Sequence, residues 1–275
     1  MTLAEALRAA ASQGLARLDA QLLLLHALGR AQDERTWLIA HDADELPRAS
    51  ADVYRQLCER RAAGEPLAYI VGHKEFFGLL LQVDRRVLVP RPDTETLVEW
   101  AVELLGDGAG KSAIDLGTGS GAIALAIKRH CPAAQVEAVD VSQDALAVAQ
   151  ANARALALDV GFHQAFWLAG ARGRYDLIAS NPPYIAAADP HLASLRHEPL
   201  GALAAGADGL DDIRAIAAQA PRHLQPGGWL LLEHGWDQAA PVRELLAAAG
   251  LRNIGSRADL AGIARCTGGQ CLELG

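Results

Sequence analysis

The residues best suited to chemistry are Asn181, Pro182, Pro183 and Tyr184, which follow the apolar run 175–179. Such a short run is typical of a buried parallel strand, and open α/β sheets bind ligands where these strands end. A proline has no N–H, so the Pro182 carbonyl is a fixed acceptor beside the Asn181 amide. Two converging acceptors can hold an N–H₂ group, and Tyr184 offers a flat stacking wall. We predict a site for a planar nitrogen; a plain diproline turn is the alternative.

A second group of residues could bind a nucleotide. The strand-like segment 113–116 runs into the glycine-rich turn 117–121 and then into a helix, 122–130. Glycines let the backbone approach a ligand closely, and a helix N-terminus offers free N–H groups. The next strand, 135–139, ends in Asp140, where a carboxylate is placed to bind both ribose hydroxyls of an adenosine. A tight turn beside a solvated aspartate is the alternative.

Two further stretches supply candidate binding residues. Arg91 stands between two prolines, so it cannot be helical and could reach a ligand; a solvated loop arginine is equally consistent with this pattern. Asp93 is placed to cap a helix that runs to about Leu105. The aromatic pair 166–167 could border an adenine, although a pair like this belongs to a core more often.

These residues need a sheet to bring them together. Strand-like and helix-like stretches alternate from residue 113 to a last strand at 264–274, which predicts a mostly parallel, doubly wound α/β sheet. Residues 2–64 read only as helices, and their apolar stripes predict a bundle, most simply a substrate-docking module. The strand-like runs 67–71 and 79–83 predict a linking β-hairpin. The expected domains are 1–64, a helical docking domain; 65–90, a β-hairpin linker; and 91–275, the catalytic domain.

Composition argues against several classes of protein. The 275 residues include 25 Lys and Arg against 33 Asp and Glu, so the net positive face that grips a nucleic-acid backbone is not supplied. Four cysteines without Cys-x-x-Cys spacing and nine histidines without ligand spacing predict neither a metal site nor a disulfide framework. No apolar run is long enough to cross a bilayer, and residues 1–5 do not resemble a secretion signal. We expect a cytoplasmic protein.

Taken together, the stretches 115–121 and 181–184 with Asp140 resemble an S-adenosylmethionine-dependent methyltransferase that acts on a planar nitrogen. Two families share this set: adenine amino-methyltransferases of DNA, and methyltransferases that modify the glutamine side-chain amide of peptide chain release factors. The second family also carries several motifs that this chain matches. These are Glu65-Pro66-Leu67-Ala68-Tyr69-Ile70, Gly72-His73-Lys74-Glu75-Phe76, Pro90-Arg91-Pro92-Asp93-Thr94-Glu95, His197-Glu198-Pro199 and the stretch 206–211.

The resemblance to release factor glutamine methyltransferases implies a Rossmann-like catalytic domain. It implies methyl transfer from S-adenosyl-L-methionine, with S-adenosyl-L-homocysteine as product, to the glutamine of the release factor Gly-Gly-Gln motif, which supports translation termination. The implied catalytic residues are Asn181 and Pro182. The implied substrate-binding residues are Asn181, Pro182, Pro183, Tyr184, Arg91 and Glu198. The implied cofactor-binding residues are Gly117, Thr118, Gly119, Ser120, Gly121, Asp140, Trp167 and Asn181. The helical domain would dock the release factor, and no nucleic acid, membrane or metal partner is expected.

The chain departs from the family pattern at two positions. Asp93 stands where the family usually has Glu, and Phe166 stands where an acidic residue is expected before Trp167. The second change removes the usual acceptor for the adenine amino group. Two alternatives stay open: a nucleic-acid adenine methyltransferase, against which the lack of a basic face argues, and a non-catalytic cofactor-binding adaptor, against which the intact Asn-Pro-Pro-Tyr stretch argues.

Overall fold

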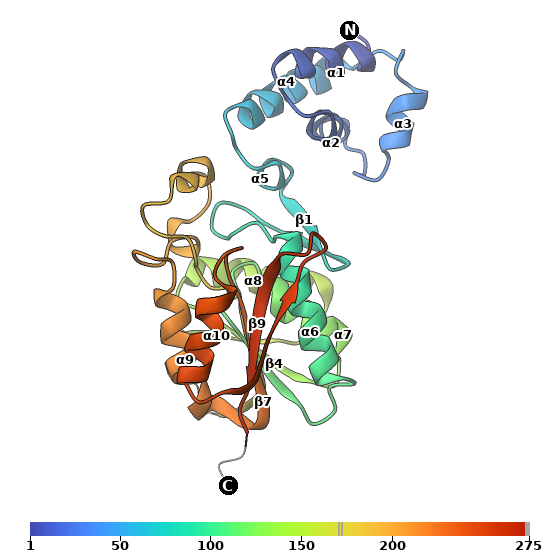
Figure 1. The fold of residues 1–275 in the computed structure, drawn as a ribbon. Coiled ribbons are helices and arrows are strands. Elements are labelled where there is room, and N and C mark those ends of the chain that lie inside the picture. Colours follow the sequence, from blue (N-terminus) through green and yellow to red (C-terminus); the bar gives the residue numbers. More distant parts are fainter. Residues whose placement is uncertain (170, 172, 273–275) are drawn as a thin grey trace. The chain divides into compact units, whose positions relative to one another are not determined.

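The computed structural model describes residues 1–169, 171 and 173–272 (Figure 1). The chain divides into two compact units, Met1–His73 and Lys74–Gly275. The boundary therefore falls later than the expected one after residue 64.

One expected strand is a helix, and this moves the boundary. Leu67–Val71, expected as the first strand of the hairpin, forms helix α5. Pro66 stands at its N-terminal cap, and Gly72, in the left-handed region at φ 82°, ends it. Ile70 and Val71 are buried in the hydrophobic core of the first unit. The hairpin pairs β1, His73–Phe76, with β2, Leu79–Gln82.

The first unit is helical, as predicted. Its helices are α1 (Leu3–Ser12), α2 (Arg17–Ala27), α3 (Arg35–Ala40), α4 (Arg48–Ala62) and α5 (Leu67–Val71). Thr2 and Glu5 form a capping box at the start of α1, which satisfies two free N–H groups of the first turn. The side chains of Leu23, Leu24 and Leu25 on α2 are fully buried, so apolar packing holds this unit together.

The second unit contains the predicted mostly parallel sheet. Among the described residues its strands follow the order β5-β4-β3-β6-β7-β9-β8, in which β9 alone runs in the direction opposite to the other strands. The strands are β3 (Ser112–Leu116), β4 (Gln135–Asp140), β5 (Gly161–Gln164), β6 (Tyr175–Ser180), β7 (Leu224–Glu233), β8 (Arg252–Ala258) and β9 (Ala264–Gln270). The last strand was expected to reach residue 274; it ends at Gln270, and residues 273–275 lie outside the described part.

Helices cover both faces of this sheet. Figure 1 shows α9 and α10 on one side and α6 and α7 on the other, and a separate apolar core lies on each side. The helices are α6 (Glu95–Leu105), α7 (Ala122–His130), α8 (Gln143–Leu156), α9 (Asp211–His223) and α10 (Ala239–Ala248), with short 3₁₀ turns η1 (Pro92–Thr94), η2 (Pro190–Leu195) and η3 (Leu200–Ala202). Asp93 was expected to cap α6, but it lies within η1, and Thr94 takes the cap position. No described helix has the length and apolarity that a membrane crossing requires.

The neighbours β3 and β6 bring the two predicted motifs together. Leu116 and Ser180 are register partners, and the Ser180 hydroxyl donates to the Leu116 carbonyl at 2.7 Å. The glycine turn 117–121 and Asn181 therefore leave the same edge of the sheet side by side. Asn152 on α8 stabilises this edge. Its side-chain amide forms hydrogen bonds with the backbone of Gln82 in the hairpin and with the carbonyl of Ser120.

Candidate active site

A cavity of about 250 Å³ lies where β3, β4 and β6 end. Its wall combines the glycine turn, the end of β4, the aromatic pair after β5 and the turn after β6. Residues from these four segments include Gly117, Gly119, Asp140, Val141, Phe166, Trp167, Asn181 and Pro183. Asp212, at the start of α9, also lines it. The position matches the binding crevice of open α/β sheets.

A buried carboxylate shapes the glycine turn. Asp115, only 1% exposed, accepts hydrogen bonds from the Thr118 hydroxyl at 2.6 Å and from the Ala124 N–H at 3.2 Å. Burial raises the pKa of Asp115 to about 7. Thr118, expected to bind the cofactor, is therefore turned towards the protein interior, where it ties the turn to α7.

Asp140 anchors the turn from the other side. Its Oδ2 accepts from the Gly119 N–H at 2.9 Å, and its Oδ1 accepts from the Ser142 N–H at 2.8 Å. Each carboxylate oxygen keeps a lone pair for a ribose hydroxyl. Gly119 has φ 55°, and a Cβ built there would meet nothing within 4 Å. No side chain therefore separates its backbone from the cavity. These features fit an adenosyl group.

The other two residues of the turn face inwards. Ser120 is buried, and its carbonyl accepts from Asn152. Gly121, at φ 85°, starts α7, and a Cβ there would lie 3.0 Å from a Leu125 methyl carbon. Neither residue lines the cavity, so of the five turn residues expected to bind cofactor only Gly117 and Gly119 face it.

The aromatic wall is formed by Trp167 and Phe166. Trp167 is 8% exposed and adopts a left-handed φ of 51°, which places its ring 3.1 Å from where a Gly117 Cβ would be. Phe166 is 55% exposed, with its ring centre 5.6 Å from that of Trp167. Burial raises the pKa of Asp212, and the neighbouring Trp167 indole partly offsets this. An apolar, aromatic wall suits a purine ring.

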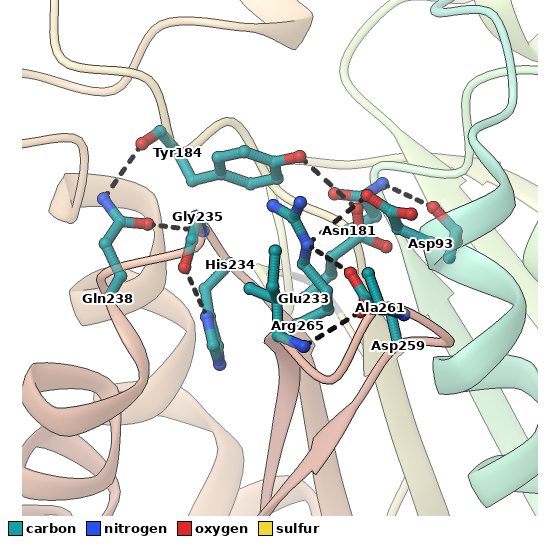
Figure 2. Close-up of polar contacts among 12 residues, drawn as sticks. Asp93, Asn181, Tyr184, Glu233, His234, Gly235, Gln238, Asp259, Ala261 and Arg265 are labelled. Atoms are coloured by element: carbon teal, nitrogen blue, oxygen red, sulfur yellow. Dashed lines mark hydrogen bonds and ion pairs between the residues drawn. The ribbon is translucent and has the colours of Figure 1, made fainter.

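Hydrogen bonds hold both ends of the Asn-Pro-Pro-Tyr turn in place. The Asn181 Nδ2 donates to the Thr94 hydroxyl oxygen at 3.1 Å, while Pro182 and Pro183 are buried. The Tyr184 hydroxyl donates to Glu233 at 3.4 Å, and Gln238 donates to the Tyr184 carbonyl at 3.0 Å (Figure 2). The turn is therefore preorganised by residues far away in the sequence.

Arg91 and Glu198 pair with each other. The guanidinium lies 2.5 Å from one Glu198 oxygen, and the Val89 N–H donates to the other oxygen at 3.1 Å. The Glu198 side chain is 3% exposed and that of Arg91 is 34% exposed. Both residues were expected to bind substrate, but only the Arg91 side chain is partly exposed; Glu198 is buried and stabilises the loop that carries Arg91.

The residues of this region that were not expected from the sequence include Val141, Asp212, Thr94 and Glu233. Glu233 could have been predicted from the sequence, because it is the last residue of β7 as Asp140 is the last residue of β4. Both strands end at the edge of the sheet where ligands bind. Thr94 and Asp212 had no such signal, because each is a polar residue at a helix start, where capping explains it equally well.

The arrangement places Asn181 on the wall of a cavity that Gly117, Asp140 and Trp167 also line. The described residues contain no group of three or more His, Cys, Asp or Glu side chains that could hold a metal ion.

Two family models match the chain. One, the PrmC N-terminal domain, covers residues 2–72, and the other, the methyltransferase small domain, covers residues 94–197. The first match coincides with the helical unit, and the second spans β3 to β6 with the cavity between them.

Named proteins resemble the chain over nearly its whole length. The release factor glutamine methyltransferase of Bordetella pertussis is 51% identical over 263 residues, which are 94% of this chain and 96% of that protein. Its counterpart in Xylella fastidiosa strain Temecula1 is 49% identical over 270 residues, 97% of each chain. The 16S rRNA N2 G1207 methyltransferase of T. thermophilus, solved with AdoMet and guanosine, has a TM-score of 0.55 and 20% identity, over 72% of this chain and 49% of that one. The last likeness shows the methyltransferase fold.

Proposed function

The chain belongs to the family of release factor glutamine methyltransferases, and from this premise we propose how its site works. It transfers a methyl group from S-adenosylmethionine to the side-chain amide nitrogen of a glutamine in a peptide chain release factor. One observation supports our assignment most: the Asn181 amide, held by Thr94, stands on the wall of the cavity that Gly117, Asp140 and Trp167 also line. Tritiated S-adenosylmethionine offered together with a release factor and DNA tests this, since label should enter the protein and label in the DNA would refute it.

We assign the cofactor to the cavity between the glycine turn and Trp167. Asp140 would hold the ribose hydroxyls, the bare backbone of Gly117 and Gly119 would face the adenosyl group, and Trp167 would border the purine. S-adenosylmethionine, when bound, supplies an electrophilic methyl group on a positively charged sulfur. Thr118, Ser120 and Gly121 would shape the turn without touching the cofactor.

The protein compensates for the weak nucleophilicity of an amide nitrogen, whose lone pair is delocalised. The Asn181 side-chain oxygen and the Pro182 carbonyl would each accept one N–H of the glutamine, which enriches that nitrogen in electron density. The Tyr184 ring would stack against the plane of the glutamine amide. Holding the nitrogen in line with the methyl group can contribute about 7–11 kcal/mol. No strong base is needed, because the methylated nitrogen is acidic.

The Arg91 guanidinium would contact the release factor near the glutamine. Its partner Glu198 is buried, and Arg91 and Val89 each engage one of its oxygens, so it acts through them rather than on the substrate. The Pro on each side of Arg91 keeps the loop extended.

The partner is a protein. The net charge of −8 disfavours binding to a nucleic-acid backbone, and the helical unit offers a surface for the folded release factor. Release factors act on cytoplasmic ribosomes, so we place the enzyme in the cytoplasm.

Deleting residues 1–72, which leaves the β1–β2 hairpin complete, should raise KM for an intact release factor by about thirtyfold or more, the equivalent of one interface hot spot. The KM for a short glutamine peptide should change little, because the peptide meets only the catalytic unit. Steady-state kinetics with both substrates measure this, with circular dichroism to verify folding. Equal losses on both substrates would mean that the helical unit only stabilises the protein.

Replacing Phe166 with aspartate should sharpen selection for adenine. The exposed Phe166 ring cannot accept a hydrogen bond from the adenine amino group, whereas a carboxylate can. We expect the affinity ratio of S-adenosylhomocysteine over S-inosylhomocysteine to rise about tenfold. Competition assays on both proteins give the ratio, and an unchanged value would refute the role of this position.

The chain carries its own Gly268-Gly269-Gln270, and this sequence should not be methylated. It lies within β9, paired with β7 and β8. The Gln270 oxygen accepts from Asn253 at 2.7 Å, and its nitrogen donates to the Gly227 carbonyl at 2.9 Å. The amide is therefore already occupied. Intact mass after incubation with S-adenosylmethionine alone should stay constant; a gain of one methyl group would contradict this.

A further inference from the structure

We propose that Glu233, at the end of β7, is a positioning residue for methyl transfer. Acting through Thr94 and Tyr184, it determines which end of the Asn181 amide faces the substrate and fixes the Tyr184 ring. This inference rests on the function proposed above for Asn181 and Tyr184. Glu233 itself does not line the cofactor cavity, so it acts through these neighbours.

The geometry joins four side chains from distant parts of the chain. Glu233 is 1% exposed, and its Oε1 accepts from the Tyr184 hydroxyl at 3.4 Å (Figure 2). Its Oε2 is buried without a hydrogen-bond partner among the described residues. The Thr94 hydroxyl lowers the pKa of the Glu233 carboxyl without forming a full hydrogen bond to it in this structure, and the same hydroxyl oxygen accepts from Asn181 Nδ2 at 3.1 Å. A buried carboxylate with spare acceptor capacity is costly, so a role for it is expected.

The direction of the Asn181 amide depends on the Thr94 hydrogen. An asparagine side chain has a donor end and an acceptor end, and glutamine N–H₂ can be held only by the acceptor end. The Nδ2 of Asn181 points away from the substrate when Thr94 serves as its acceptor. Thr94 serves in this way when its own hydrogen is directed at Glu233. An ionised Glu233 carboxylate can only accept hydrogen bonds, so it keeps the Thr94 hydrogen directed towards itself and leaves the Thr94 oxygen to accept from Asn181.

Protonation of Glu233 would weaken the arrangement. Burial raises the pKa of Glu233 to about 7, and the neighbouring Asp93 of η1 adds to this, while Thr94, Tyr184 and Arg265 oppose it. The Arg265 guanidinium is itself held by Asp259 at 3.0 Å and lies 3.4 Å from Asp93 (Figure 2). A further titratable neighbour is the thiol of Cys266 on β9, whose pKa is raised by burial and also by this carboxyl. A protonated Glu233 can donate to Thr94 and compete with Asn181, so turnover should fall as the pH falls through about 7.

Stability should follow the opposite course. Because folding raises the pKa of Glu233 above its ordinary 4.5, its contribution to the free energy of unfolding is complete below that value. That contribution is lost as the pH rises through about 7. A neutral glutamine at this position should remove this pH dependence and make the protein relatively more stable above pH 8. A residue with a purely structural role would lose activity and stability together.

Glu233→Gln is the direct test, with Glu137→Gln as matched control. Glu137 on β4 also accepts from a tyrosine, Tyr175, at 2.7 Å, but touches neither Asn181 nor Thr94. At pH 8.5 we expect kcat of Glu233→Gln to fall about tenfold while KM for S-adenosylmethionine stays within about twofold. The ratio of wild-type to variant kcat should shrink below pH 6, and using this ratio cancels the titration of Asp115, which both proteins share. Glu137→Gln should retain wild-type kcat.

Substitutions at Thr94 provide a second test. Thr94→Val removes the hydroxyl at nearly constant shape and should lower kcat about as much as Glu233→Gln, and the double variant should lose little more, because both act through one link. Thr94→Ser restores the hydroxyl and should recover most of the activity. A pH-independent kcat ratio, or additive losses in the double variant, would overturn the inference while wild-type methylation of glutamine still stood. If the wild type methylated no glutamine, the proposed function itself would fail.

Discussion

Replacing Asn181 with alanine should lower kcat for methyl transfer about 100- to 1,000-fold, while affinity for the cofactor falls only modestly. The substitution removes one of two acceptors that act on the reacting nitrogen, and preorganised polar contacts of this kind are worth about that much in rate. Asn181 also lines the cofactor cavity, but many other residues line it too, so cofactor binding does not depend on this one contact.

Single-turnover kinetics and calorimetric titration with S-adenosylhomocysteine separate the two effects. We expect a large loss in the rate of the chemical step and a change in Kd of less than about fivefold. Turnover close to that of the wild type would remove Asn181 from the catalytic residues. A Kd that rose as much as kcat fell would instead make it a cofactor ligand.

The second large effect should come from Gly209→Ala, which lies outside the cavity wall. A Cβ at Gly209 would lie 2.2 Å from the Tyr184 carbonyl oxygen, a contact that no real Cβ makes. The Tyr184 backbone would have to move. Since an error of about 1 Å in positioning can cost about 100-fold in rate, we expect a loss of that size in kcat.

Gly78→Ala is the matched control for this substitution. Both glycines have φ 76°, so alanine meets the same backbone strain of about 1 kcal/mol at either position. A Cβ at Gly78 meets nothing within 4 Å, whereas at Gly209 it meets the backbone of Tyr184. Thermal unfolding and kcat measured on both variants distinguish strain from displacement. Equal losses of kcat would show that the position of Tyr184 does not depend on Gly209.

The parts of the site that the sequence predicts are those that a local pattern specifies. Asp140 and Asn181 each follow a recognisable buried strand, and the edge of a parallel sheet brings such strand ends together. The glycine turn is equally local, so its place beside Asn181 follows from the fold class. The mostly parallel sheet itself follows from the alternation of strands and helices.

The sequence could not predict contacts between distant segments. Arg91 and Glu198 are 107 residues apart, and Asn181 and Thr94 are 87 apart, and no periodicity links such pairs. Burial also matters: the resemblance implies that Glu198 binds substrate, but the fold buries this side chain and engages both its oxygens. The prediction of a strand at Leu67–Val71, where the structure has a helix, was wrong for another reason. A short apolar run suits a buried strand and a buried helix equally well.

Mapping the methyl group on a release factor tests the central claim most directly. The enzyme would be incubated with S-adenosylmethionine and an unmethylated release factor, and the product digested and sequenced by mass spectrometry. We predict one added methyl group on the side-chain nitrogen of the glutamine in Gly-Gly-Gln, lost with Asn181→Ala and retained with Glu137→Gln. Methylation at another residue, or an unmodified release factor beside methylated nucleic acid, would contradict the account.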